Sequence, residues 1–122
     1  MKPLHWVKSS KRDLLDLPVK VRGDFGFALY QAQLGAKSFY AMPMTGFGGA
    51  GVLEVVVEND GDTFRAVHTV KYAKAVYVLH VFQEKSKKGR KTPRLDIDLI
   101  KSRLIAAGDH YRATYETTSR KE

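Results

Sequence analysis

Three side chains that could act on an anion, Glu54, Arg65 and His80, lie in three successive strand-like segments of the sequence. An arginine binds phosphate or stabilises developing negative charge, a histidine transfers protons near neutral pH, and a carboxylate can orient either of them. The same three residues could instead form a cross-strand ion pair that only fixes the register of a sheet. Both interpretations require that they share one face of the sheet.

The turns of the predicted sheet decide whether these residues share a face. The predicted strands are residues 52–58, 64–70 and 75–82. In an antiparallel hairpin, facing residues lie at equal distances from the centre of the turn. A second turn centred on residues 72–73 therefore places Arg65 opposite His80. A first turn centred on residues 60–61 places Glu54 on the same face, close to Arg65.

The opposite face of the predicted sheet is apolar and is expected to form the core. Its polar exceptions are His68 and Tyr77, and His68 is interpreted as a core histidine with a local hydrogen-bond partner. The apolar members are Leu53, Val55, Val57, Phe64, Ala66, Val70, Leu79 and Val81. The face with the three charged residues is expected to be a partly open surface.

Cationic side chains crowd the segment that follows the last predicted strand. They are Lys85, Lys87, Lys88, Arg90, Lys91 and Arg94. The segment leaves the strand that carries His80 and leads into a helix whose N-terminal amides favour anions. We therefore expect contacts with phosphate or an RNA backbone, and a solvated loop is the alternative interpretation.

Composition and charge narrow the class of protein. The length of 122 residues fits a single domain, and 43% hydrophobic with 28% charged residues is typical of a globular rather than a disordered chain,. The net charge of +8 favours contact with nucleic acid or the ribosome, against a merely soluble basic protein,. The sequence has no cysteine, and its four histidines lack a metal-binding spacing, so neither a metal nor a cofactor is predicted,.

The sequence contains no pattern of a secretion signal or a membrane span. The first ten residues hold only short apolar stretches, and no run approaches the roughly 18 apolar residues that a spanning helix needs,. A cytoplasmic protein without a membrane partner is therefore expected.

Residues 46–51 match the G-x-G-x-x-G pattern of dinucleotide-binding sites,. In those sites the pattern joins a strand to a helix, whose N-terminus binds the phosphates. Here the pattern follows a loop and enters a predicted strand, so a nucleotide site is not expected.

The order of the predicted elements indicates an α+β fold. A short strand at residues 4–7 precedes a helix with a capping box at Ser10–Asp13, and a second helix runs from Pro18 to Gly35,. After the three strands, Thr92 and Pro93 begin a last helix that ends at Gly108, and residues from about 109 onward are expected to fray or to add a small edge element. We predict an N-terminal helical hairpin packed on a small twisted antiparallel sheet, with a C-terminal helix, in one domain spanning residues 1–122.

The sequence resembles the phage-related Gp49-like branch of the RelE/HigB toxins. The similarity extends from the first predicted strand to the last helix and is densest in residues 76–89, Val-Tyr-Val-Leu-His-Val-Phe-Gln-Glu-Lys-Ser-Lys-Lys-Gly, followed by Thr92-Pro93. The resemblance implies a RelE/ParE-like toxin fold and a helix-turn-helix antitoxin as partner. It also implies metal-independent cleavage of ribosome-bound mRNA, in which the 2′-hydroxyl of the RNA attacks the adjacent phosphate.

The resemblance also assigns site residues. It implies that the candidate catalytic residues are Glu54, Arg65, His80 and Lys85. The predicted RNA-binding residues, Lys87, Lys88, Arg90 and Lys91, come from the cationic segment itself. The sequence departs from the family where Val55 follows Glu54 in place of a frequent arginine, and where Glu84 replaces a frequent lysine. A gyrase-binding inhibitor of the ParE-like branch and a non-catalytic nucleic-acid-binding module are the alternative functions.

Overall fold

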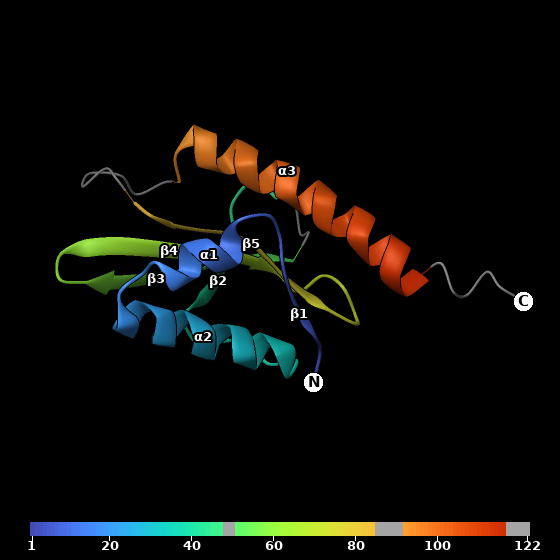
Figure 1. Ribbon diagram of the computed structural model, residues 1–122, viewed down its shortest axis with the longest axis horizontal. Coiled ribbons are helices and arrows are strands. Elements are labelled where there is room, and N and C mark those ends of the chain that lie inside the picture. The colour runs from blue at the N-terminus through green and yellow to red at the C-terminus, as the bar shows by residue number, and fades with distance from the viewer. Residues whose placement is uncertain (48–50, 85–91, 117–122) are drawn as a thin grey trace, which may run out of the picture.

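The computed structural model describes residues 1–47, 51–84 and 92–116, and Figure 1 shows their arrangement. The elements are β1 (Leu4–Trp6), α1 (Ser10–Leu15), α2 (Val19–Gln33), β2 (Ala41–Pro43), β3 (Val52–Asn59), β4 (Asp62–Thr69), β5 (Val76–Gln83), α3 (Arg94–Tyr111) and a π-helical turn, η1 (Arg112–Glu116). Along these described ranges, no helix is long and apolar enough to cross a membrane. The glycine-rich run at residues 46–51 lies partly outside them.

The strands form one mixed sheet. In the described residues the sheet has five strands in the order β1-β5-β4-β3-β2. The pairs β2–β3, β3–β4 and β4–β5 are antiparallel, but β1 runs parallel to β5. The predicted small, wholly antiparallel sheet is therefore wrong, because the sheet is larger and mixed. Parallel pairing needs a long connection, and most of the chain separates β1 from β5.

Helices cover both faces of this sheet, so the α+β structure has three layers (Figure 1). The N-terminal helices α1 and α2 pack on one face, over a core that includes Phe25 and Val81. The C-terminal helix α3 crosses the other face, over a core that includes Leu79 and Ile100. The expected open face is therefore wrong, because α3 buries much of it.

The three long strands lie within two residues of their predicted ends, but β2 was not predicted. It has three residues and ends in Pro43, which has no amide hydrogen to donate to a sheet,. Its pairing with β3, where Met42 lies opposite Glu54, makes it an edge strand. So short a segment carries no periodicity, and only the tertiary pairing defines it as a strand.

The helix ends depart from their predicted positions by small steps. Ser9, not Ser10, precedes α1, and its hydroxyl donates a hydrogen bond to Asp13. Pro93, not Thr92, flanks the start of α3. α3 continues through the predicted stop at Gly108, because Tyr111 beyond it packs into the α3-side core. Residues 109–116 are therefore helical rather than frayed.

Candidate functional site

A β-bulge in β5 decides which residues surround His80. The β3–β4 hairpin has the predicted register. In the β4–β5 hairpin, Phe82 lies opposite Arg65 and Val67 lies opposite His80, and the register shifts at the next pair. The predicted pairing of Arg65 with His80 is therefore wrong. One extra residue, Leu79, is inserted in β5 without a partner in β4, which is the definition of a bulge,.

The bulge turns His80 towards α3. In a regular strand, residues separated by three positions point to opposite faces, yet Val78 and Val81 both belong to the core under α1 and α2,. Between them, Leu79 packs in the α3-side core, and His80 contacts Asp96 of α3. The prediction that Leu79 shares a face with Val81 is therefore wrong. The bulge accounts for both positions, since it gives two consecutive side chains the same face.

A buried ion-pair network joins β3, β4 and the residue after β5. Arg65 Nη1 donates to Glu54 Oε2 at 3.0 Å, and Arg65 Nη2 and Nε approach Glu84 Oε1 at 2.7 and 2.8 Å. The Thr92 hydroxyl donates to the same Glu54 oxygen at 3.1 Å. The structure thus brings Glu54 and Arg65 together, and it adds Glu84, which differs from the family pattern.

This network determines what Arg65 can do. Burial alone would lower the pKa of Arg65, but the hydrogen bonds to Glu84 and Glu54 outweigh it and raise the pKa above its ordinary value. Two carboxylates already neutralise the guanidinium in this structure. Arg65 would have to leave one of them before it could bind a phosphate.

His80 forms a hydrogen-bonded pair with a carboxylate. Its Nε2 lies 2.7 Å from Asp96 Oδ1, and its ring stacks on Phe82 with centroids 4.5 Å apart. The residue is 6% exposed, and Nδ1 is buried without a hydrogen bond to the described residues. Burial lowers the pKa of His80 and outweighs the opposing effect of Asp96, while Arg103 lowers the pKa further. The neutral imidazole is therefore the dominant form at pH 7.

Arg103 of α3 lies beside this pair and also contacts Ser9, the residue before α1. Its Nη1 donates to the carbonyl of Leu79 at 3.0 Å, and its Nη2 donates to the Ser9 hydroxyl at 3.1 Å. The Ser9 hydroxyl in turn donates to Asp13 at 2.7 Å. Burial lowers the pKa of Arg103, and the charge of Asp13 opposes this effect. The cluster around His80 therefore includes groups from α1, β5 and α3.

The predicted catalytic Lys85 and the predicted RNA-binding residues Lys87, Lys88, Arg90 and Lys91 lie outside the described residues. The residues on either side of this segment are described. Glu84 binds Arg65, and Thr92 binds Glu54. The two described residues that flank the basic segment therefore contact the same ion-pair network.

A protein-family model matches residues 12–105, which is most of the chain, and it describes phage-derived Gp49-like proteins (DUF891). The chain belongs to this Gp49-like family. It is a family of RelE/HigB-type toxins, and membership implies an antitoxin partner. No curated protein and no solved structure matches the chain.

A pair of histidines in the toxin, His5 and His110, lies near the far end of α3. The rings of His5 and His110 are 4.8 Å apart. Tyr115 is hydrogen-bonded to His5 Nε2 at 2.7 Å, and Tyr77 to His110 Nδ1 at 2.6 Å. Burial and the charge of His110 lower the pKa of His5, and burial raises the pKa of Tyr77 to about 12. Within the described ranges, no group of three or more metal-binding side chains occurs here or elsewhere.

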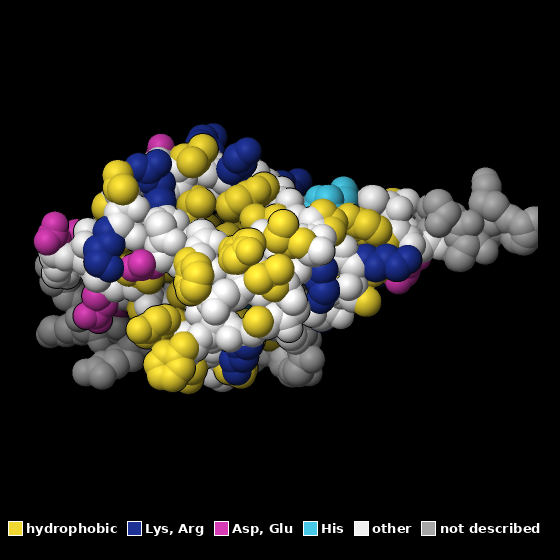
Figure 2. Space-filling view, turned by 90° about the horizontal axis from the view of Figure 1, so that it is seen from below, with side chains coloured by type: hydrophobic (Ala, Val, Ile, Leu, Met, Phe, Trp, Pro, Cys, Tyr) yellow, Lys and Arg dark blue, Asp and Glu magenta, His cyan; other side chains and the backbone are white. Residues whose placement is uncertain are grey.

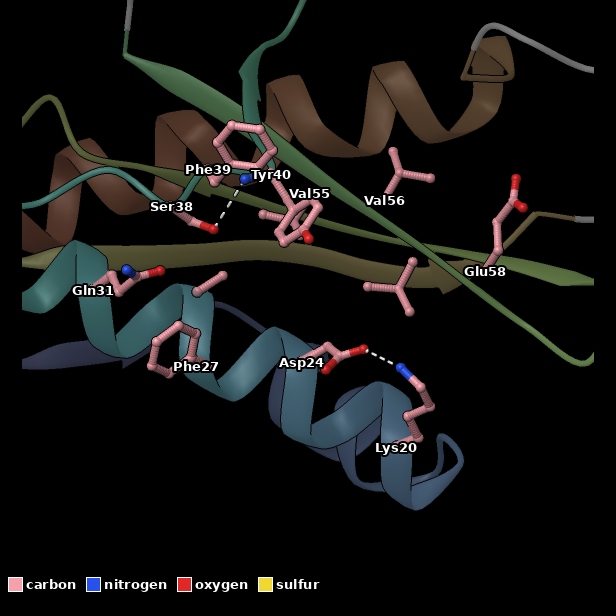
Figure 3. A pocket seen from close by; sticks show the side chains of 12 residues that line it. Lys20, Asp24, Phe27, Gln31, Ser38, Phe39, Tyr40, Val55, Val56 and Glu58 are labelled. Atoms are coloured by element: carbon pink, nitrogen blue, oxygen red, sulfur yellow. Dashed lines mark hydrogen bonds and ion pairs between the residues drawn. The ribbon is translucent and has the colours of Figure 1, made fainter.

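The exposed aromatic side chains of the toxin gather on the α2 layer. Figure 2 views this side and shows hydrophobic side chains spread over its surface. A groove of about 420 Å³ runs between α2, residues 38–40 before β2, and strand β3. Phe27, which is 62% exposed, and Tyr40 line it, and the Lys20–Asp24 ion pair closes one end (Figure 3). This surface and the contact between His80 and α3 thus lie on opposite faces of the sheet.

Sequence reasoning missed Asp96, Arg103 and Glu84 as members of the site. Asp96 and Arg103 are seven residues apart, which places them on the same side of a helix, and this spacing was a detectable signal,. Glu84 was noticed only as a departure from the family. The contacts of Asp96 with His80 and of Arg103 with Leu79 depend on how α3 crosses the sheet, which periodicity does not specify. The contact of Glu84 with Arg65 depends on the register of β4 and β5.

Proposed function

We propose that the toxin is a metal-independent endoribonuclease that cleaves ribosome-associated mRNA, with His80 as the residue that accepts a proton. The observation that carries this proposal is the 2.7 Å contact between His80 Nε2 and Asp96 Oδ1. A carboxylate on one ring nitrogen fixes the tautomer and leaves the other nitrogen, Nδ1, free of a proton. The net charge of +8 supports an anionic substrate,.

The RNA supplies its own nucleophile in this reaction. His80 Nδ1 removes the proton of a 2′-hydroxyl, and the 2′-oxygen attacks the adjacent phosphorus. The bond to the 5′-oxygen breaks, and that oxygen takes a proton, which leaves a 2′,3′-cyclic phosphate and a 5′-hydroxyl. Because Nδ1 is buried in this structure, binding of RNA has to expose this edge of the ring,.

The basic segment completes the proposed site. Lys85 would stabilise the charge that develops on the phosphate, and Lys87, Lys88, Arg90 and Lys91 would bind neighbouring phosphates. The proposed role of Arg65 and Glu54 is to anchor the two ends of this segment, since each binds a residue that flanks it.

Induced expression with mapping of new RNA 5′ ends tests this function. The wild type and a control variant, Lys101→Ala, which changes an exposed residue of α3, should stop translation and produce new ends. His80→Ala should reduce cleavage by about 100-fold or more, and Asp96→Asn should also reduce it. Cleavage by the purified toxin on ribosomes should persist in EDTA.

Two outcomes would favour the alternative functions. Growth arrest with DNA damage and stalled supercoiling, without new RNA ends, would indicate a gyrase-binding inhibitor. Binding to intact RNA with a steep salt dependence and no cleavage would indicate a nucleic-acid-binding module. In either case toxicity should be the same in the wild type and in His80→Ala.

For the antitoxin that the family implies, we propose a helix-turn-helix protein that acts with the toxin in the cytoplasm. Co-expression of this toxin with the reading frame next to its gene should restore growth and yield a complex that survives gel filtration. A neighbouring product that neither binds nor restores growth would contradict this choice of partner.

A further inference from the structure

We propose that Arg103 is the positioning residue of the His80 site, because it holds the Leu79 bulge in β5 and so keeps His80 against Asp96. This inference rests on the proposed function in one respect, which is that His80 acts on RNA. The geometric part, that Arg103 sets the position and charge state of His80, stands on the contacts around the bulge.

Arg103 binds the backbone of the bulge in β5. Leu79 is the extra residue of β5 and is paired with no residue of β4, and a bulge disrupts the regular ladder of hydrogen bonds locally,. Arg103 Nη1 donates to this carbonyl at 3.0 Å. A buried carbonyl without a donor is unfavourable, so Arg103 compensates for the bond that the bulge removes.

The bulge determines on which face of the sheet His80 lies. If the pairing of Thr69 with Tyr77 and of His68 with Val78 continued without the bulge, His80 would lie opposite Ala66, on the face under α1 and α2 and away from Asp96,. Arg103 and Asp96 both belong to α3. The same helix therefore stabilises the bulge through one residue and binds the redirected imidazole through the other.

Arg103 itself is a buried cation. The residue is 8% exposed, and its Nε makes no hydrogen bond to the described residues. In the described part of the chain, its other partner is the Ser9 hydroxyl, which links it to Asp13. Burying a cation without a direct carboxylate partner is unfavourable. We infer that the charge of Arg103 acts on a neighbouring group.

The neighbouring group on which the charge of Arg103 acts is His80. Asp96 of α3 and Asp13 of α1 favour the imidazolium, whereas Arg103 favours the neutral ring. A general base must be unprotonated at the working pH. Arg103 therefore supplies the charge that opposes the two carboxylates, and it does so from the position that also fixes the bulge.

Titration of the imidazole of His80 by nitrogen-15 NMR tests this proposal without reference to RNA. The variants are Arg103→Ala and Arg103→Lys, with Lys101→Ala as the matched control on the exposed side of α3. In Arg103→Ala, the titration of His80 should shift: to a higher pH if the ring stays against Asp96 and loses only the opposing charge of Arg103, and to a lower pH if the ring also leaves Asp96. In Arg103→Lys, which keeps the charge, and in the control, it should titrate near the wild-type pH.

Cleavage assays on the same variants test the link to function. Arg103→Ala should lose about tenfold or more of kcat, and the acidic limb of its pH profile should move in the same direction as the titration of His80. Arg103→Lys should keep the wild-type pH profile even if its kcat is lower.

An unchanged His80 titration in folded Arg103→Ala would overturn the proposal. If this variant fails to fold, Arg103→Lys decides, because a changed titration despite the retained charge would equally contradict the proposed role. If the wild-type toxin does not cleave RNA while the titrations behave as expected, the positioning role holds and the proposed function fails.

Discussion

The buried His68 should make the stability of the toxin fall between pH 7 and pH 5. His68 is 1% exposed, and burial lowers its pKa from 6.5 to about 4. Above pH 6.5 the ring is neutral in both the folded and the unfolded chain. As the pH falls below 6.5, the unfolded chain binds a proton that the folded chain does not bind until about pH 4, so acid favours unfolding.

The size of the effect follows from the pKa values. Between pH 6.5 and about pH 4, each pH unit lowers the free energy of unfolding by about 1.4 kcal/mol,. The interval from pH 7 to pH 5 includes about 1.5 units of this range, so the fall amounts to about 2 kcal/mol. His80 and His5, whose pKa values are also lowered, act in the same direction. The contribution of His68 must therefore be isolated by substitution.

Urea unfolding of the wild type and of His68→Leu at both pH values provides this comparison. Between pH 7 and pH 5, the wild type should lose about 2 kcal/mol more than the variant. At pH 7 the variant should be close to the wild type, because His68 Nδ1 forms no hydrogen bond with the described residues. Equal losses in the two proteins would refute the argument.

Three substitutions test other parts of the structure by urea unfolding. Arg65→Met should destabilise the toxin by about 3 kcal/mol, because it leaves two partly buried carboxylates without their cation,. The exposed Arg12→Ala should change little, and a loss below about 1 kcal/mol in Arg65→Met would argue against a stabilising network,. Phe25→Ala should cost about 3–5 kcal/mol, since Phe25 is fully buried, and a smaller loss would mean that the core collapses around the vacancy,. Gly35→Ala should cost about 1 kcal/mol, because φ is +84° there, and an unchanged midpoint would contradict the backbone assignment,.

The sequence was sufficient where local chemistry determines the structure. The β3–β4 register follows from a tight turn in which Asp60 and Gly61 both have positive φ, and this turn placed Glu54 near Arg65,. The β4–β5 register could not be obtained in the same way. The bulge at Leu79 is stabilised by Arg103, which lies 24 residues further along the chain.

The contrast between local and long-range interactions also explains which partners of His80 could be predicted. The strand pattern correctly places it in β5, but Asp96 reaches it only because α3 crosses the second face of the sheet. The predicted open face ignored this helix, since an apolar stripe shows that a helix packs without showing where. Long-range packing, rather than local propensity, therefore determined the errors in the predicted site.

The length of α3 gives the toxin two natural reporters. The helix has 18 residues and spans about 27 Å,. Near its start Asp96 contacts His80, and in its last turn His110 contacts Tyr77, so both ends are tied to β5 through an imidazole. Motion of α3 as a rigid rod would perturb both rings together, whereas lifting of one end would perturb a single ring. The two histidine signals can therefore show how the helix responds when RNA or an antitoxin binds.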